Sequence, residues 1–429
     1  MKKKTLYNFL FSFFVLLLFI PFVVYHFGSK EQMPLKGAYV PVEKPEITFE
    51  GFFNESFQAD YEEYWNENFW LRPVLVRFFN QFQFSLYRKS SVPYVKVGKA
   101  DYLYETNYID SYFGYDFIGE ARWTNRVKTI QIVKDSLKKF NCDLLIVLAT
   151  GKGFFYPEYI PDYYKPSGNP TNYEVLSKKL SQTDVPYIDF NKWFLENKKS
   201  SEYVLYPKTG IHWSYYGMTK VADSLINYIE KLRNINMAKM VIDTIELKSE
   251  TEHSDADVED AMNLLCDISK PQMAYPRFHF ESQGKVKPRV IVISDSFYWD
   301  MFSAGFSTQV FNDGKFWYYY NEVYPDHWNS PALVKDRNLF EEIKKTDVVI
   351  VLCNDQNLKD IGWGFFKEAS KMFLHFETWK RDKRVAEIEQ QMRENKDWFN
   401  LLLKKSFSTG IRFDSIMRKD AIYMYELEK

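Results

Sequence analysis

Cysteine is scarce in this sequence, and charges of the two signs nearly cancel. The 429 residues contain three cysteines, Cys142, Cys266 and Cys353, each isolated from the others along the chain. Their scarcity and isolation exclude a disulfide framework and the zinc motifs that use paired cysteines. The 56 Lys and Arg nearly balance the 57 Asp and Glu, leaving a formal charge of −1. The chain therefore has no net field that would attract nucleic acid, and we expect no nucleic-acid partner.

Apolar and aromatic residues, in contrast, are abundant. They make up 46% and 19% of the chain, which is enough for a large core and excludes intrinsic disorder. At about 150 residues per domain, the length allows three domains, or one elaborated α/β domain with appendages.

The amino terminus predicts the compartment. Three lysines at positions 2–4 precede an uncharged stretch over residues 5–27. As a helix this stretch would be roughly 34 Å long, enough for a ~30 Å hydrocarbon core. The alternative is a cleaved signal peptide, but the bulky residues 25–27 do not resemble its small-residue cleavage site. We expect residues 1–28 to form a basic cap and single-pass anchor in the cytoplasmic (inner) membrane. The positive-inside rule then places the rest of the chain on the periplasmic side.

The middle of the chain alternates between strand-like and helix-like segments. A proline-containing linker over residues 29–50 precedes a helical pattern over residues 52–88, and a short strand pair is expected within residues 95–105. A second amphipathic helix is expected at residues 120–139. Short apolar runs separated by helical stretches then follow at residues 144–148, 185–190, 289–293 and 347–353. This order predicts a three-layer α/β/α domain with a mainly parallel sheet over residues 51–365.

The last part of the chain is expected to be helical. Residues 366–429 carry apolar side chains at helical spacing, with Gly410 as a C-cap and Asp414 as an N-cap. We expect this region to pack on the α/β domain.

A hydroxyl group lies at the end of one predicted strand. Residues 289–293 run directly into Ser294, Asp295 and Ser296, which places them at the carboxyl edge of a parallel sheet where a helix is expected to begin. Backbone N–H groups at such a helix start can stabilise an oxyanion. The alternative is that the three residues only cap the helix.

A nucleophilic serine needs a base, and two of the six histidines are candidates. His212 lies in a loop before a predicted helix at residues 218–232, where its imidazole could accept the serine proton. A histidine next to a tryptophan is also often only a packed surface residue. His327 follows Asp326 directly, but consecutive side chains diverge, so we interpret His327 as a loop or substrate-contact residue.

Several short segments together resemble the SGNH-hydrolase-like proteins of alginate O-acetylation, of the AlgJ and AlgX type. The similarity covers roughly residues 50–425. Its pieces, in order, are Phe69–Arg72, Val97–Tyr104, Lys152, Tyr156–Pro161, Ile188–Asp189, Gly210–Ser214, Ser294–Phe297 and Trp398–Ala421. The resemblance implies that Ser296 is the nucleophile and His212 the general base.

The sequence departs from that family pattern at two positions. Gly210 stands where the family usually has the aspartate that orients the histidine, and Ser294 replaces the usual glycine before the Asp-Ser pair. Asp295 and Asp189 are candidates for the orienting role, although Asp189 could simply cap a strand end. A serine–histidine dyad stays open. By resemblance to ordinary SGNH hydrolases, Asn354 could donate to the oxyanion, but asparagines at strand ends are also common in turns.

Other groups are assigned to substrate contact or to structure. Trp213, Trp317 and Tyr318 lie near the candidate site elements in sequence and could stack on sugar rings, although most of the aromatic residues are expected to belong to the core. Lys152 is a further candidate for substrate contact. The acidic cluster of residues 255–260 lacks the glycine and the final glutamate of a calcium loop. We interpret it as the solvated start of a helix and predict neither a metal nor another cofactor.

The resemblance implies a membrane-anchored acyltransferase that esterifies hydroxyl groups of an exported polysaccharide, most simply with acetyl. A membrane-bound O-acyltransferase would supply the acyl group. The same residues are compatible with an esterase that uses water as the acceptor. They are also compatible with a degenerate domain that binds glycan or scaffolds an export complex, or with alanyl transfer to teichoic-type polymers of the kind that the related DltD proteins perform.

Overall fold

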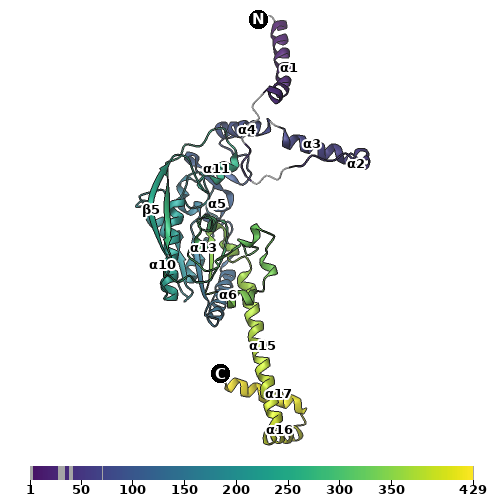
Figure 1. Cartoon of the computed structure of the whole chain (residues 1–429), viewed down its shortest axis with the longest axis vertical. Helices are drawn as coiled ribbons and strands as arrows, with labels where there is room; N and C mark the ends of the chain where they lie inside the picture. The colour runs from purple at the N-terminus through teal and green to yellow at the C-terminus, as the bar shows by residue number, and fades with distance from the viewer. Residues whose placement is uncertain (1–2, 28–33, 38–41, 70, 429) are drawn as a thin grey trace.

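The computed structural model describes residues 3–27, 34–37, 42–69 and 71–428. An α/β body lies in the middle, with helices of the amino-terminal and carboxyl-terminal regions extending from opposite ends (Figure 1). The predicted helix at the amino terminus is present as α1 (Lys3–Phe27). Across the described residues, none of the helices combines the length and the apolar character that crossing a membrane requires. The membrane crossing predicted for residues 5–27 is therefore not supported.

A six-stranded sheet forms the centre of the body. Its order is β4-β3-β10-β7-β8-β9, and every neighbouring pair is parallel except β8 and β9. The strands are β3 (Asp143–Ala149), β4 (Tyr187–Asp189), β7 (Val290–Ser294), β8 (Lys315–Tyr318), β9 (Glu322–Tyr324) and β10 (Val348–Asn354). The mainly parallel sheet predicted from the sequence is thus confirmed, and the four predicted strands are present within two residues of their expected ends.

Alternate residues of the central strands pack on opposite faces of this sheet. In β3, Leu145 and Val147 belong to one core cluster, and Leu144 and Ile146 belong to the other. Such alternation follows from the strand period of two. It explains the apolar runs of the sequence, because both faces are covered by helices.

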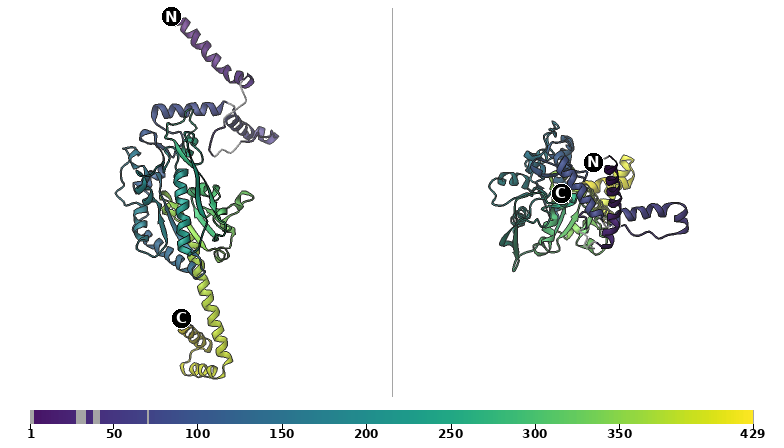
Figure 2. Two further views of the ribbon diagram at one scale, coloured as in Figure 1. Left: turned by 60° about the vertical axis from the view of Figure 1, so that its left-hand side comes forward. Right: turned by 90° about the horizontal axis from the view of Figure 1, so that it is seen from above.

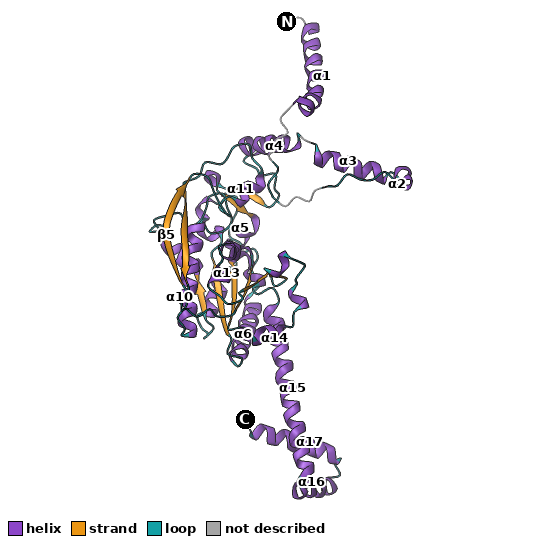
Figure 3. Cartoon of the chain, viewed as in Figure 1, coloured by secondary structure: helices purple, strands orange, loops and turns teal. Residues whose placement is uncertain are grey.

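Helices cover both faces of the sheet (Figure 3). The first core cluster includes residues of α9 (Phe190–Asn197), α10 (Tyr215–Arg233), α12 (Trp299–Ser303) and α13 (Phe306–Gln309). The second includes residues of α6 (Glu120–Lys138), α8 (Asn172–Leu180), α14 (Leu339–Lys344) and the start of α15 (Phe365–Glu394). Two short helices, α5 (Thr106–Tyr112) and α7 (Lys152–Phe155), lie near the carboxyl ends of the strands.

Two hairpin-like pairs lie outside the central sheet. The predicted short pair is present as β1 (Val95–Val97) and β2 (Leu103–Glu105). A longer antiparallel pair, β5 (Lys239–Lys248) and β6 (Met273–Glu281), was not expected from the sequence. The segment that joins β5 to β6 contains the short helix α11 (Asp257–Met262).

The predicted helix at residues 52–88 is divided into three helices. They are α2 (Phe49–Phe53), α3 (Ser56–Asn68) and α4 (Arg72–Tyr87). Only α4 joins the first core cluster, through Phe84, and the Asn80 amide donates to the Met262 carbonyl at 2.7 Å. No residue of α3 is buried.

The carboxyl-terminal helices extend from the body as an arm (Figure 2). The arm consists of α15 beyond its first turns, α16 (Lys396–Thr409) and α17 (Phe413–Leu427). It has its own core cluster, which includes Val385, Leu402 and Ile416 and is separate from the two clusters of the body. The prediction that residues 366–429 pack on the α/β domain is therefore wrong beyond the start of α15. Gly410 is the predicted C-cap of α16, whereas Arg412 and not Asp414 is the N-cap of α17.

Candidate active site

Ser296 lies directly beyond the carboxyl end of a central strand. All five residues of β7 are buried, so the position of the strand is fixed by the core. Asp295 is the N-cap of the short 3-10 helix that begins at Ser296, and its carboxylate accepts from the Phe297 N–H at 3.1 Å. Ser296 is partly exposed, whereas Phe297 next to it is buried. The side chain of Ser296 therefore faces the edge of the sheet rather than the core.

His212 reaches Ser296 from a loop that precedes α10. Its Nε2 lies 2.8 Å from the Ser296 Oγ. The loop is held by Ser214, which caps α10 by accepting from the Gly217 N–H and donates its own hydroxyl to the Val204 carbonyl. The structure thus brings together the two residues for which the resemblance implied nucleophile and base.

Asp257 supplies the carboxylate that the sequence pattern lacked. Its Oδ2 lies 2.6 Å from the Nδ1 of His212, and its Oδ1 accepts from the backbone N–H groups of Ile211 and Val258. These contacts complete a hydrogen-bonded chain from Ser296 through His212 to Asp257. The chain has the connectivity of a serine–histidine–acid triad.

Gly210 explains how an acid from another segment reaches the histidine. A Cβ atom at Gly210 would lie 2.6 Å from the Ser254 carbonyl oxygen and 2.8 Å from that of Asp255. Any side chain there would push away the segment that leads into α11. The glycine that replaces the usual family aspartate is therefore the residue that lets Asp257 approach.

A buried lysine supports the same loop from below. The ammonium group of Lys152 donates to the carbonyl oxygens of Lys208 and Gly210, at 2.7 and 2.6 Å. Burial lowers the pKa of Lys152 well below its usual value, although the charge of Asp257 opposes this shift. Lys152 is thus a structural support and not the substrate contact that was expected.

The electrostatic environment of the site raises the pKa of His212. Burial by itself would lower the pKa of His212, but the charge of Asp257 and its hydrogen bond outweigh burial and raise the pKa above 6.5. Nearby Glu105 is also affected, because burial and the charge of Asp257 raise its pKa. His212 can therefore accept a proton readily while Asp257 stabilises the resulting imidazolium.

The three residues proposed for orienting or oxyanion roles make other contacts. Asp295 accepts from the Asn354 N–H and the Asn357 side-chain amide, both at 3.0 Å, and so joins the ends of β7 and β10. The Asn354 amide donates to the Tyr108 hydroxyl at 3.2 Å. Asp189 caps α9 by accepting from the Lys192 N–H and also accepts from the Tyr173 hydroxyl. None of these hydrogen bonds involves His212 or Ser296.

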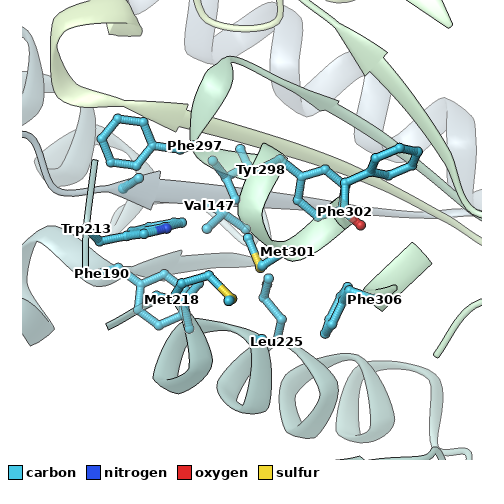
Figure 4. Close-up of a cluster of buried hydrophobic side chains, with 14 of the residues drawn as sticks. Val147, Phe190, Trp213, Met218, Leu225, Phe297, Tyr298, Met301, Phe302 and Phe306 are labelled. Atoms are coloured by element: carbon cyan, nitrogen blue, oxygen red, sulfur yellow. The ribbon is translucent and has the colours of Figure 1, made fainter. Parts of the chain in front are cut away.

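The aromatic residues expected to contact substrate are mostly part of the core. Trp213 is fully buried, and its ring meets that of Phe297 edge to face with centroids 5.0 Å apart (Figure 4). Trp317 is buried on the opposite face of the sheet, in the second core cluster. Tyr318 is partly buried against Trp299. His327 contacts the backbone of Ala332 in its own loop, in agreement with its interpretation as a loop residue.

A cavity of about 310 Å³ opens over the hydrogen-bonded chain. We call it the site cavity. Its walls include the three residues of that chain and polar side chains from other elements, namely Glu105, Asn107, Tyr319 and Gln356. A molecule in this cavity would therefore meet the Ser296 hydroxyl together with several hydrogen-bonding groups.

The acid was missed in the sequence because it lies in a cluster that looked solvated. The predicted helix start is present, because α11 begins at Asp257. Asp255 and Glu259 are buried, however, so the interpretation of the whole cluster as solvated was wrong. Glu259 accepts from the Ile268 N–H and from Lys270, and its own N–H donates to the Thr209 carbonyl next to Gly210. The signal available in the sequence was a glycine in place of the usual acid, together with acidic residues elsewhere. Within the described residues, no group of three or more His, Cys, Asp and Glu is arranged to hold a metal ion.

Part of the chain matches a known protein family. Residues 95–281 match the family described as "SGNH hydrolase-like domain, acetyltransferase AlgX". The predicted resemblance is thereby confirmed. The matched segment contains His212 and Asp257 and ends before Ser296. A search of curated proteins finds no match.

Solved structures with similar backbones include three proteins. The O-acetyltransferase domain of Pseudomonas putida AlgJ has a TM-score of 0.44 and 12% identity, covering 65% of this chain and 99% of that chain. Bacillus cereus PatB1 has a TM-score of 0.36 and 14% identity, covering 55% and 91%. Pseudomonas aeruginosa AlgX has a TM-score of 0.36 and 16% identity, covering 62% and 66%.

Proposed function

We propose that this protein is an extracytoplasmic O-acetyltransferase that esterifies hydroxyl groups of an exported polysaccharide through an acyl-Ser296 intermediate. The observation that carries the proposal is the hydrogen-bonded chain from Ser296 through His212 to Asp257 at the wall of the site cavity. The family match to an acetyltransferase domain supports the choice of acyl group.

The first half-reaction transfers the acyl group to the protein. His212 Nε2 takes the proton of the Ser296 hydroxyl as Oγ attacks the carbonyl carbon of the acyl donor. The Ser296 backbone N–H stabilises the oxyanion. When the tetrahedral intermediate collapses, the bond to the donor oxygen breaks, and the leaving group receives the proton from His212. The acyl group is then esterified to Ser296.

The second half-reaction transfers the acyl group to the acceptor. A sugar hydroxyl loses its proton to His212 Nε2 and attacks the acyl-serine carbonyl carbon. The bond to Ser296 Oγ breaks, and Oγ recovers the proton from the imidazolium. Throughout both steps Asp257 holds the Nδ1 proton of His212, which keeps Nε2 available as the base.

The acyl donor and the compartment belong to the same proposal. A membrane-bound O-acyltransferase would supply the acyl group, and the acceptor would be a polysaccharide outside the cytoplasm. An esterase would use the same first half-reaction but pass the acyl group to water. The two activities are separated by whether the acyl group appears on a glycan or as free acid.

The test is covalent labelling followed by transfer. A fluorophosphonate probe should label the full chain, and Ser296→Ala should abolish labelling while His212→Ala reduces it strongly. With 4-nitrophenyl acetate as donor and a glycan acceptor, mass spectrometry should detect O-acetyl groups on the glycan. Ser296→Ala should reduce this transfer by about 10⁴-fold or more. An unlabelled Ser296 together with intact folding would contradict the proposal and favour a glycan-binding scaffold.

A further inference from the structure

A second cavity, of about 520 Å³, lies near the site cavity but is not part of it. We call it the flanking cavity. It lies between the first half of α6 and the start of α15, which are neighbours in the fold (Figure 1). Its walls are largely apolar, with two aromatic residues, Trp363 and Phe366, and the aliphatic residues Ile130 and Ile361. Cations and polar groups complete them, namely Arg126, Lys367, Asn125, Thr129 and Asp360.

One short segment and one pair of contacting rings contribute to the walls of both cavities. The 3-10 helix over Asp355–Asp360 follows β10, and its Gln356 lines the site cavity whereas Asp360 lines the flanking cavity. Tyr319 lines the site cavity, and its ring meets that of Trp363 nearly at right angles with centroids 5.2 Å apart. A direct contact between two aromatic rings therefore links the walls of the two cavities.

Both loops that present these rings have unusual backbone conformations. Tyr319 and Tyr320 have φ of 49° and 53°, and Trp363 has φ of 44° between Gly362 and Gly364, which are also positive. Bulky residues rarely adopt this region, and such strain is concentrated at functional sites. The Tyr319–Trp363 pair is thus held in place at a cost in backbone energy.

The wall chemistry of the flanking cavity fits a sugar unit. A sugar ring offers a C–H face that packs on an aromatic ring and a rim of hydroxyl groups that bind polar and charged side chains. Burial lowers the pKa of Arg126, as expected for a guanidinium that is partly withdrawn from water. A polymer would reach both cavities by crossing the carboxyl ends of the strands from one helical layer to the other.

We propose that the flanking cavity is a subsite for the acceptor glycan, holding a sugar unit near the one whose hydroxyl reaches Ser296. The inference rests on the proposed function and names the part of the acceptor that the chain recognises. It requires an acceptor of several sugar units, because a single sugar cannot occupy both cavities.

Direct binding tests the subsite without acyl transfer. The full chain carrying Ser296→Ala is titrated calorimetrically with a mannuronate hexasaccharide, with cellohexaose and with the corresponding monosaccharides. At least one hexasaccharide should bind more tightly than its monosaccharide. Adding Trp363→Ala or Arg126→Gln should raise its Kd about tenfold, which corresponds to about 1.4 kcal/mol, and Trp363→Phe should recover part of the loss. The matched controls are Trp379→Ala, which is exposed on the arm, and Lys128→Gln, two residues beyond Arg126 on the same helix. Neither control should change Kd.

Turnover gives a second measurement. The ratio of kcat/KM for the hexasaccharide to that for the monosaccharide should fall about tenfold in Trp363→Ala. The subsite is overturned if neither hexasaccharide binds, if monosaccharides bind equally well, or if Trp363→Ala and Arg126→Gln match their parent. Failure of Ser296 to label would instead overturn the proposed activity, and glycan binding that depends on Trp363 would still support the subsite.

Discussion

Ser296 and Asp257 reach His212 from regions that are built in different ways. Ser296 follows β7, a fully buried strand with a parallel neighbour on each side. Asp257 begins a six-residue helix within the segment that joins β5 to β6, which form a separate two-stranded sheet. The nucleophile is therefore positioned by the core, whereas the acid is positioned by hydrogen bonds from the Ile211 and Val258 N–H groups.

This difference indicates which residue of such a site can be supplied by a different segment of the chain. The Asp257 carboxylate is fixed by the Ile211 N–H and by the close approach at Gly210. A short segment can supply such contacts without any change in the central sheet. The strand end that presents Ser296 cannot be replaced in this way, because its register is shared with β8 and β10.

Among the changes that test this comparison, replacing the acid, Asp257, should lower the rate most. In Asp257→Asn the side-chain amide can donate to Nδ1 of His212, which favours the wrong imidazole tautomer and should lower kcat roughly 10³–10⁴-fold. The measurement is steady-state hydrolysis of 4-nitrophenyl acetate. The matched control is Asp260→Asn on the same helix, whose partner is Lys36, and it should stay within about twofold. If Asp257→Asn also stayed within twofold, Ser296 and His212 would act as a dyad.

Closing the space at Gly210 should have a smaller effect. In Gly210→Ala the new methyl group meets backbone oxygens of the 254–255 segment, so Asp257 must move away from His212. Misplacement of about 1 Å can cost on the order of 10²-fold in rate, and overpacking costs roughly 1–3 kcal/mol of unfolding free energy. Rate measurements and thermal unfolding of the variant would show both. An unchanged rate would mean that the acid does not depend on the close approach.

The pH dependence of kcat/KM should show the contribution of the acid, Asp257, separately from that of the nucleophile, Ser296. Only neutral His212 can accept a proton, and Asp257 raises its pKa above 6.5. The value of kcat/KM should therefore fall as the pH drops through a pKa above 6.5. Removing the charge in Asp257→Asn should lower that pKa and move the acid limb to lower pH. An acid limb at the same pH in both proteins would assign it to a group other than His212.

The smallest effect on the rate is expected for a substitution in the arm. Such a substitution destabilises helices that lie far from the site cavity. Leu402 is fully buried in the core cluster of the arm. Leu402→Ala should cost roughly 2–5 kcal/mol in the stability of those helices and leave kcat/KM within about twofold, since that cluster is separate from the body. Thermal unfolding and hydrolysis rates together check this. A large loss of rate would show that the arm supports the site.

The sequence was informative where burial on both sides left a continuous apolar pattern. The strands β3, β7 and β10 were predictable because each contains a continuous apolar run with a polar residue at one end only. The strand β5 was not, since all ten of its residues are exposed or partly exposed and show no such run. The arm was predicted to be helical, but its separation from the body depends on which apolar faces meet, and spacing alone does not give that.

The site was predictable only in part for a related reason. Ser296 lies next to a recognisable strand, and the Gly210–Ser214 segment resembles a known pattern, so both could be found in the sequence. Asp257 acts through a contact between segments 45 residues apart, and its acidic neighbours suggested a solvent-exposed helix start. Its contact with His212, and the burial of its neighbours Asp255 and Glu259, are properties of the folded chain.

A small rotation at the start of α15, beside the flanking cavity, would produce a large displacement at the far end of this long helix. At 1.5 Å per residue, the 30 residues of α15 extend about 45 Å. A change of about 10° in its direction would carry the far end by about 8 Å. Phe366 and Lys367, in the first turn of α15, also line the flanking cavity. A small displacement at that wall would therefore become a larger displacement at the tip of the arm. A spectroscopic label at the tip would report it as a change in distance.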